Sequence, residues 1–463
     1  MAIVTPGVVP ASALLAEAPS PWLAEWSRFA AALRFGDLPG GVADHARLVL
    51  LDTLGAIAAG AQEPEMTALA QRMVAREGAG EAPVIGLAHL ARPGTAAFLN
   101  GTAGTMLELD EGNQYARGHP AIHVVPALLA APRGDGAALL LALALGYEIG
   151  ARVGIASKLL VTMHPHGTWG TLGAAMGTAK LHGATKAEMQ AVVNIASTLG
   201  LATSRRTMLE GGTVRNSYAG VANMLGLTAW DLARAGFEGE RDGVATVFGT
   251  VAASDFQPEE MVRDLGARWE IARNYFKRHA ACRYTHGALD AMGEILRRTG
   301  PLRPGQVAAI EVRTYVWAAQ LDSPAAPNML AAKFSLPFAL ASFVAHGGAP
   351  VEAFRAPARQ DPDIAALATR VRVEEDAALT AMLPGLRPAR LRVTLADGQV
   401  HEAEALTNRG DTEDPYRAEE VREKFRELAG PVYGAERARA IEDAVMALSP
   451  HVEAASLAEL LRR

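Results

Sequence analysis

The sequence has very little cysteine: among its 463 residues only Cys282 carries a thiol. One cysteine excludes an intramolecular disulfide and any metal site built from several thiolates. The amino-terminal segment also lacks the basic stretch that opens a secretory signal peptide. We therefore expect a protein of the reducing cytoplasm, in which Cys282 is by default a small buried residue.

An excess of basic charge is also missing, since 44 Lys and Arg stand against 50 Asp and Glu, a net charge of −6. Such a chain has no basic field to attract nucleic acid or an anionic membrane. The uncharged apolar runs at residues 120–132 and 136–147 are shorter than the roughly 18 residues that span a bilayer. We predict a globular protein with neither a nucleic-acid partner nor a membrane partner.

Several common cofactor and nucleophile motifs are absent. Gly134-Asp135-Gly136 lacks the third glycine and the preceding strand of a dinucleotide loop, and the turn at 210–213 lacks the Gly-Lys-Ser/Thr of a phosphate loop. There is no Gly-x-Ser-x-Gly nucleophile turn. His119 and His123 have a spacing that could hold a metal on a helix, but Pro120 interrupts it and no Glu follows His119. We predict no metal and no organic cofactor.

Apolar periodicity of the helical type covers most of the sequence. The expected helices begin near Trp22 and continue at residues 43–60, 64–77, 95–109, 137–159, 166–181, 186–201, 219–235, 286–298, 333–345, 417–428 and 435–448. In the helix at 166–181, small residues recur at helical spacing, which lets a neighbouring helix approach closely. Gly236 suits the cap that ends the helix before it.

The pattern changes near residue 265. Residues 306–315 and 389–406 alternate as strands do, and Asp397-Gly398 within the second is a strong hairpin signal. We therefore predict a mainly α fold: a large all-helical domain, residues 1–265 plus 409–463, interrupted by a smaller α/β domain, residues 266–408. The Pro- and Ala-rich segment before residue 20 is expected to form a loose arm.

The stretch from residue 100 to 130 concentrates the polar chemistry. Glu108, Asp110 and Glu111 follow one helical segment, and His119 immediately precedes the next. Titratable groups at helix ends, partly out of water, are the ones whose pKa can be tuned. Farther along, His164, Arg215 and Lys277 each lie beside turn residues. A single histidine at a helix start is more often structural than catalytic, so none of these residues alone identifies a site.

Together, ordered markers along the chain are more specific. They are Leu51-Asp52-Thr53-Leu54-Gly55, Asn100-Gly101-Thr102-Ala103, Leu109-Asp110-Glu111, His119-Pro120, Gly146-Tyr147-Glu148, His164-Pro165, residues 277–286 with Asp290, and Phe334-Ser335-Leu336-Pro337. In this order the sequence resembles the MmgE/PrpD family, which includes 2-methylcitrate dehydratase, cis-aconitate decarboxylase and iminodisuccinate epimerase. The resemblance covers nearly the whole chain.

The resemblance implies a helical domain interrupted by an α/β lid domain, an active site in the cleft between them, a homodimer and chemistry without a metal or organic cofactor. It places the family's catalytic histidines at His119 and His164, its acidic residue at Asp110 and its lid lysine at Lys277. The helical-domain lysine of the family is replaced here by Arg215, and the second acid of its Asp-Asp pair is Glu111.

The family's known substrates are small di- and tricarboxylates, so the resemblance implies proton abstraction beside a carboxylate, in a cofactor-independent lyase of the dehydratase type. Epimerisation, decarboxylation and a homologue without catalysis remain alternatives. We expect His164 and His119 to act as the acid/base pair, with Asp110 orienting one of them and Lys277 making a point contact with a substrate carboxylate. The expected substrate-binding residues are Arg215, Arg283, Tyr284 and His286. A structural alternative is that Arg215 pairs with Glu210 and never meets substrate.

Overall fold

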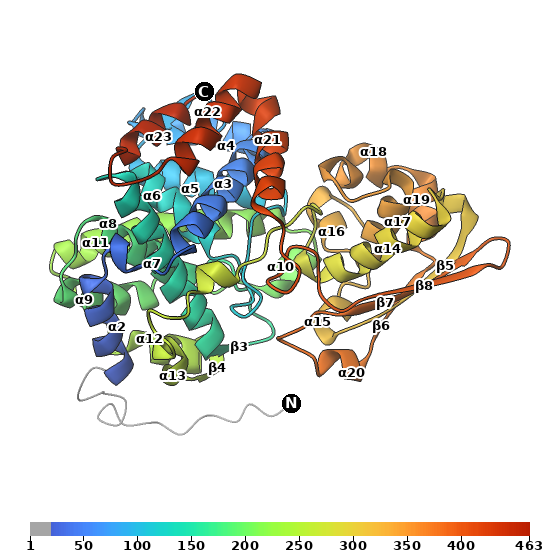
Figure 1. Cartoon of the computed structure of the whole chain (residues 1–463), viewed down its shortest axis with the longest axis horizontal. Helices are drawn as coiled ribbons and strands as arrows, with labels where there is room; N and C mark the ends of the chain where they lie inside the picture. The colour runs from blue at the N-terminus through green and yellow to red at the C-terminus, as the bar shows by residue number, and fades with distance from the viewer. Residues whose placement is uncertain (1–19) are drawn as a thin grey trace.

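The structure is a computed structural model that describes residues 20–463, so the arm predicted before residue 20 lies outside the described residues. Figure 1 shows a helical body on one side and a mixed sheet with its own helices on the other. The C-terminal helices lie on the helical body. The fold is mainly α, as the sequence predicts; the domain boundaries at 265/266 and 408/409 stay predictions.

The helical body is built from segments on both sides of the sheet region. Its helices are α2 (Pro21–Ala32), α3 (Val42–Gly60), α4 (Pro64–Glu77), α5 (Pro93–Thr105), α6 (Val125–Ala130), α7 (Gly136–Ala156), α8 (Gly170–Leu181), α9 (Lys186–Ser197), α10 (Arg205–Leu209), α11 (Tyr218–Arg234), α12 (Gly243–Thr246), α13 (Pro258–Val262), α21 (Ala418–Tyr433), α22 (Ala435–Met446) and α23 (Ala454–Leu460). After α11, Gly236 has the positive φ of 87° expected of a glycine that ends a helix.

Helix α7 is the central helix of this body. Its 21 residues make it long and apolar enough to cross a membrane by length and composition, so the expectation that this segment is too short was wrong. The uncharged run ends before Glu148, but the helix continues to Ala156, and Glu148 and Arg152 form an ion pair at 2.6 Å buried within it. Since 89% of its most apolar window is buried inside the protein, α7 is packed as a core helix.

The small residues predicted to allow close packing do so where α8 meets α7. A Cβ atom on Gly146 would lie 2.6 Å from the carbonyl oxygen of Gly173, and one on Gly173 would lie 2.9 Å from that of Gly146. Both positions therefore require glycine for the two backbones to touch.

The helical body is not entirely helical, which corrects the sequence prediction. Strands β1 (Ala82–Val84) and β2 (His89–Ala91) form one antiparallel pair, and β3 (Ser157–Leu159) and β4 (Ala253–Phe256) form another. Strands of three or four residues are too short to show the alternation by which a strand is recognised. The unrecognised strand β3 also shortens one predicted helix. That helix was expected to reach residue 159 but ends at Ala156, where β3 begins.

The α/β part contains a four-stranded sheet in the order β6-β5-β7-β8. Its strands are β5 (Val307–Thr314), β6 (Val371–Glu375), β7 (Ala389–Leu395) and β8 (Val400–Ala405). The predicted hairpin joins β7 and β8, with Gly398 at a φ of 89°. Helices α14 (His286–Thr299), α17 (Leu336–His346) and α19 (Pro362–Ala368) pack against the sheet (Figure 1).

Short helices complete this part: α15 (Val316–Ala319), α16 (Met329–Lys333), α18 (Ala356–Arg359) and α20 (Ala377–Thr380). The helix predicted at 333–345 is α17, which begins at Leu336; of the predicted range only Lys333 lies in the preceding α16. Ser335 separates them because its hydroxyl accepts a hydrogen bond from the backbone N–H of Phe338 at 3.0 Å and caps α17.

Candidate active site

A cavity lies where loops of the helical body meet the α/β part. Its lining residues are Glu108, Arg117, His119, His164, Pro165, His166, Arg205, Met208, Arg215, Tyr275, Cys282, Arg283, Tyr284, Phe334 and Arg387. Five of them are arginines and one is an acid. The cavity therefore presents mainly positive charge, which suits an anionic small molecule.

The loop after α5 brings the acids and His119 together. Asn113 closes this loop, because its side-chain oxygen accepts hydrogen bonds from the backbone N–H groups of Tyr115 at 3.0 Å and Ala116 at 2.9 Å. Glu108 and Arg117 both have positive φ, 55° and 57°, which is uncommon for residues other than glycine. Such backbone conformations persist where the surrounding structure fixes them, and they are often found at functional sites.

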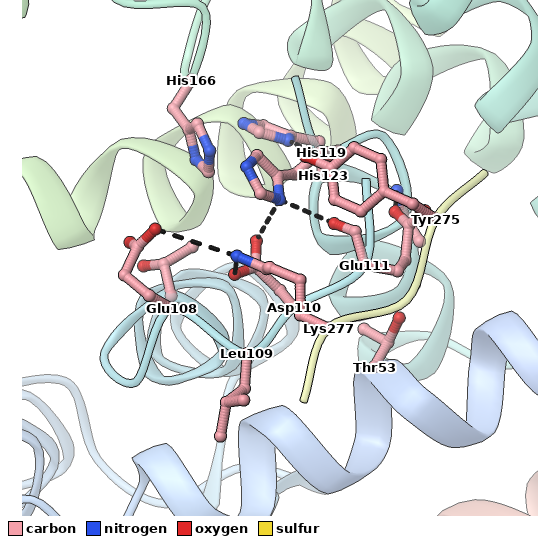
Figure 2. A network of polar contacts seen from close by, with 12 residues as sticks. Thr53, Glu108, Leu109, Asp110, Glu111, His119, His123, His166, Tyr275 and Lys277 are labelled. Carbon is pink, nitrogen blue, oxygen red and sulfur yellow. Dashed lines mark hydrogen bonds and ion pairs between the residues drawn. The ribbon is translucent and has the colours of Figure 1, made fainter. Parts of the chain in front are cut away.

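His119 is oriented by two oxygen atoms. Its Nδ1 lies 2.6 Å from the carbonyl oxygen of Glu111 and 3.0 Å from Oδ2 of Asp110 (Figure 2). Both oxygens are acceptors, so Nδ1 carries the hydrogen and Nε2 is left for a ligand. Burial favours the neutral form of Asp110, but the charges of His119 and Lys277 outweigh it and hold the pKa of Asp110 well below its ordinary value. Asp110 therefore remains a carboxylate.

Glu111 behaves differently from its neighbour. Burial raises the pKa of Glu111 to about 8, although its carboxylate accepts hydrogen bonds from the backbone N–H of Ala121 and the hydroxyl of Tyr147, both at 2.9 Å. At neutral pH this carboxyl group is mostly protonated. Glu111 thus holds the loop around His119 in place and does not supply a second negative charge.

Lys277 forms ion pairs with Asp110 and Glu108. Its Nζ is 3.5 Å from Oδ1 of Asp110 and 3.9 Å from Oε2 of Glu108, and its side chain is fully buried (Figure 2). Lys277 is not among the residues that line the cavity. The structure places it as a counter-charge to the two carboxylates, so its direct contact with substrate stays a prediction.

Arg215 also pairs with Glu108, through Nη1 and Oε1. The alternative partner considered from the sequence, Glu210, is wrong: Glu210 binds Arg206 at 2.5 Å on the exposed face of α10. Arg215 is buried, lines the cavity and lies 5.3 Å from the ring of Phe334. Its position beside the cavity agrees with the predicted substrate contact.

His164 meets Arg215 from the other side. Its Nε2 is 3.4 Å from Nε of Arg215, and its Nδ1 accepts a hydrogen bond from the backbone N–H of His166 at 3.1 Å. Burial first, and then the charge of Arg215, hold the pKa of His164 well below its ordinary value. His164 is therefore a neutral imidazole beside a guanidinium, whereas His119 lies beside a carboxylate.

Two further histidines lie between these two. His123 is a structural group: its Nδ1 donates to the carbonyl oxygen of His119 at 2.7 Å, its Nε2 accepts from the backbone N–H of Gly167 at 3.1 Å, and burial lowers its pKa to about 4.

His166 was not among the site residues predicted from the sequence. Its ring centroid is 4.6 Å from that of His119 and 5.0 Å from that of His164, and both of its ring nitrogens are buried without a partner. The His-x-His spacing at 164 and 166 was the available signal.

Of the three remaining predicted substrate-binding residues, two line the cavity and one does not. Arg283 and Tyr284 line the cavity, with Arg283 held by Asp411 at 2.5 Å and lying 4.5 Å from the ring of Tyr275. His286 does not line it; its Nδ1 faces Nη1 of Arg283 at 3.0 Å, so it lies behind that arginine. Substrate contact by His286 therefore has no support in the geometry.

A metal could in principle be held by Asp110, His119 and His166, whose ligand atoms lie within 4.8 Å of one another. Two imidazoles and a carboxylate are a known donor set for divalent ions. The ammonium of Lys277, 3.5 Å from Asp110, already compensates that carboxylate and would repel a cation. Metal-independent chemistry stays the prediction for this site.

Comparison with known proteins bears on both parts of the chain. The family model for the MmgE/PrpD N-terminal domain matches residues 24–259, and that for the MmgE/PrpD C-terminal domain matches residues 279–449. The chain is 27% identical to the cis-aconitate decarboxylase-like protein oryM of Aspergillus oryzae, covering 95% of this chain and 96% of the relative. It is 27% identical to cis-aconitate decarboxylase of Aspergillus terreus, covering 95% of each, and 24% identical to that of Homo sapiens, covering 85% of each.

Proposed function

Because the chain belongs to the MmgE/PrpD family, we propose that it is a lyase that decarboxylates cis-aconitate or a closely related unsaturated tricarboxylate, without a metal or organic cofactor. The relatives that match over 95% of the chain carry the name cis-aconitate decarboxylase or cis-aconitate decarboxylase-like protein, which favours decarboxylation over the other reactions of the family.

One observation supports this proposal most directly: two histidines of one cavity have opposite electrostatic surroundings. Nδ1 of His119 faces the ionised Asp110, whereas burial and the charge of Arg215 hold His164 neutral. Two histidines of one cavity in such different surroundings suit different roles in one reaction.

The proposed step balances as follows. The bond between carbon and one carboxylate breaks, CO₂ leaves, and the electron pair of that bond forms a new carbon–carbon double bond. The electrons of the original double bond then take a proton, which we assign to Nε2 of His119. Arginines of the cavity stabilise the charge that develops on the remaining carboxylates. His119 recovers its proton from water.

Dehydration is the second candidate, because His119 holds its hydrogen on Nδ1 and would remove a proton next to a carboxylate with Nε2. Since Nδ1 of His164 accepts from the backbone N–H of His166, neutral His164 carries its hydrogen on Nε2 and would protonate the departing hydroxyl. A homodimer and a cytoplasmic location remain proposals that rest on the family resemblance.

The test is proton NMR of the purified protein in deuterated buffer, with cis-aconitate and, separately, 2-methylcitrate. Decarboxylation would give itaconate with one deuterium in its methylene group next to the carboxylate. We expect the same rate after treatment with EDTA and dialysis. Conversion of 2-methylcitrate alone would favour dehydration, and no product or deuterium exchange from either acid would contradict both candidates.

A further inference from the structure

Arg387 has an unusual environment for a buried guanidinium. It is 2% exposed and lies in the segment before β7, where its Nη2 donates to the carbonyl oxygen of Gln114 in the helical body at 2.9 Å. Its Nε and Nη1 are buried and have no hydrogen-bond partner among residues 20–463. The rings of Tyr275 and Tyr284 flank the group, each 5.7 Å from it. An arginine buried in this way is normally paired, because an uncompensated charge is costly.

A second arginine lines the cavity with Arg387. Arg117 belongs to the helical body, and its Nη2 donates to the carbonyl oxygen of Gly154 at 2.8 Å and to that of Ser157. Burial lowers the pKa of Arg117, and the charge of Arg387 lowers it further, so the two cations repel each other. Arg117 also lines a second pocket, whose other lining residues include Lys158 and Trp317.

Of the three fully buried arginines of the cavity, two are compensated by carboxylates and Arg387 is not, while Arg117 and Arg205 are partly buried. Arg215 has Glu108 and Arg283 has Asp411. Among residues 20–463, neither Arg117 nor Arg387 has a carboxylate within 4.0 Å. Asp411 is the acid that most affects Arg387 at longer range, and its own ion pair is with Arg283.

We propose that Arg117 and Arg387 form a subsite for a carboxylate of the substrate that takes no part in bond breaking, with one arginine supplied by each part of the fold. The inference rests on the proposed function and names the residues that would hold one carboxylate of its tricarboxylate substrate. A carboxylate between the two guanidinium groups would satisfy their free donors and remove their mutual repulsion. The subsite also explains how a bound substrate would hold the α/β part against the helical body.

The alternative is that Arg387 only joins the two parts of the fold through Gln114. A structural role would change the binding of every ligand alike, whereas a subsite would affect only ligands that carry the extra carboxylate. Tricarballylate is a stable tricarboxylate, and glutarate and methylsuccinate are the dicarboxylates that remain when its central or a terminal carboxylate is removed.

The experiment measures the dissociation constants of these three acids by calorimetry for the wild type, Arg387→Gln, Arg117→Gln and the control Arg206→Gln. Arg206 is an exposed arginine outside the cavity. We expect each cavity variant to bind tricarballylate about 10- to 100-fold more weakly, as for loss of a hydrogen bond to a charged group. At least one dicarboxylate should bind the wild type and these variants within about threefold, because it lacks the carboxylate that the subsite holds.

Equal losses for all three acids, or no loss for tricarballylate, would overturn the subsite. Melting temperatures decide whether a variant has unfolded; if Arg387→Gln does not fold, the same comparison with Arg117→Gln decides. Failure of the proposed function would look different. If the wild type binds tricarballylate through these arginines but forms no product in the NMR assay, the subsite stands and the proposed reaction is wrong. If the wild type converts substrate but all variants bind tricarballylate equally well, the reaction stands and the subsite is wrong.

Discussion

His123 and His164 are both buried histidines, but their ring nitrogens have different partners. Both nitrogens of His123 are used by backbone groups, while Nε2 of His164 faces the cavity and Arg215. We expect His164→Gln and His119→Asn to lower kcat roughly 10²- to 10⁴-fold, the usual contribution of an acid or base, with a smaller loss of stability than His123→Gln because each bonds only one backbone group. His123→Gln should instead destabilise the protein by about 1–3 kcal/mol, because buried backbone groups lose their partners.

Turnover and urea unfolding of the same variants separate the two roles. The exposed His451 supplies the control, since His451→Gln should change neither quantity. If His164→Gln unfolded early but kept its specific activity when folded, His164 would be a structural residue and the proposed acid/base pair would be wrong.

Glu111 should make the stability of the protein depend on pH. Its pKa is about 8 in the folded state against an ordinary value of 4.5, so the folded state retains a proton that the unfolded chain has lost. The folded state is therefore destabilised progressively as pH rises from about 4.5 to about 8, by at most about 1.4 kcal/mol per pH unit. Below this window the group has no such effect.

Glu111→Gln removes that titration while keeping a neutral side chain of the same shape. The variant and the wild type should have similar unfolding free energies at pH 5, and the variant should become relatively more stable at pH 6, 7 and 8. Glu148, whose pKa burial raises to about 7, destabilises both proteins alike and cancels in the comparison. A difference that did not change with pH would show that Glu111 is ionised in the folded protein.

At the scale of single residues, the sequence predicted much of the site because local motifs carried it. Asp110, His119 and His164 come together as expected. Arg387 was missed because no motif surrounds it and its role depends on a contact 273 residues away. The pairing of Arg215 with Glu108, 107 residues apart, could not be read from spacing, and the nearer Glu210 was a wrong guess for that reason.

At the scale of elements, length decided which predictions succeeded. Helices such as α3, α7 and α11 run for 17 to 21 residues and show several turns of periodicity. Strand β6 was not predicted because its five residues are only half buried and show no clean alternation. Its place at the sheet edge comes from a parallel pairing with β5, a contact between distant segments that local sequence does not encode.

Helix α5 offers a test of close helix packing within one element. A Cβ atom on Gly101 would lie 2.8 Å from the Cα of Gly220 in α11, whereas one on Gly94 would meet only Met224 Cγ at 3.8 Å. Gly101→Ala should therefore cost about 1–3 kcal/mol from overpacking, despite the better helix propensity of alanine. Gly94→Ala, the matched control in the same helix, should be neutral or stabilising by up to about 1 kcal/mol.

Chemical unfolding of these two variants measures the difference directly. If Gly101→Ala were as stable as Gly94→Ala, α5 and α11 would be farther apart in solution than the structure places them. Because the carbonyl oxygen of Asn216, in the turn just before α11, accepts a hydrogen bond from the hydroxyl of Thr105 at 2.7 Å, separation of the helices should also lower activity.

At the scale of the whole molecule, the site is assembled from segments far apart in sequence. The loop after α5 supplies Glu108 and His119 to the cavity, residues 164–166 supply two histidines, and the α/β part supplies Arg387. The C-terminal helix α21 packs on α3 and reaches the same loop, because Nζ of Lys424 donates to the carbonyl oxygen of Leu109 at 2.6 Å. We therefore expect activity to depend on α21, which contributes no lining residue to the cavity.

Lys424 also forms a buried ion pair with Asp52 of α3 at 2.7 Å. Lys424→Met should destabilise the protein by about 3–5 kcal/mol, because it leaves the charge of Asp52 buried and unpaired. The double variant Asp52→Leu/Lys424→Met removes both charges and should recover most of that loss. The control is Glu427→Gln, on the same helix as Lys424. It breaks an exposed ion pair with Arg278 and should cost under about 1 kcal/mol.

Activity should not follow stability in this series. Both Lys424→Met and the double variant free the carbonyl oxygen of Leu109, the residue before Asp110, so kcat should fall in both even where the double variant is stable. Full activity in a stable double variant would mean that α21 supports the fold but does not position the loop. If the double variant instead recovers stability but not turnover, α21 positions the loop. Its Lys424 would then hold Asp110 at the distance from His119 that the reaction requires.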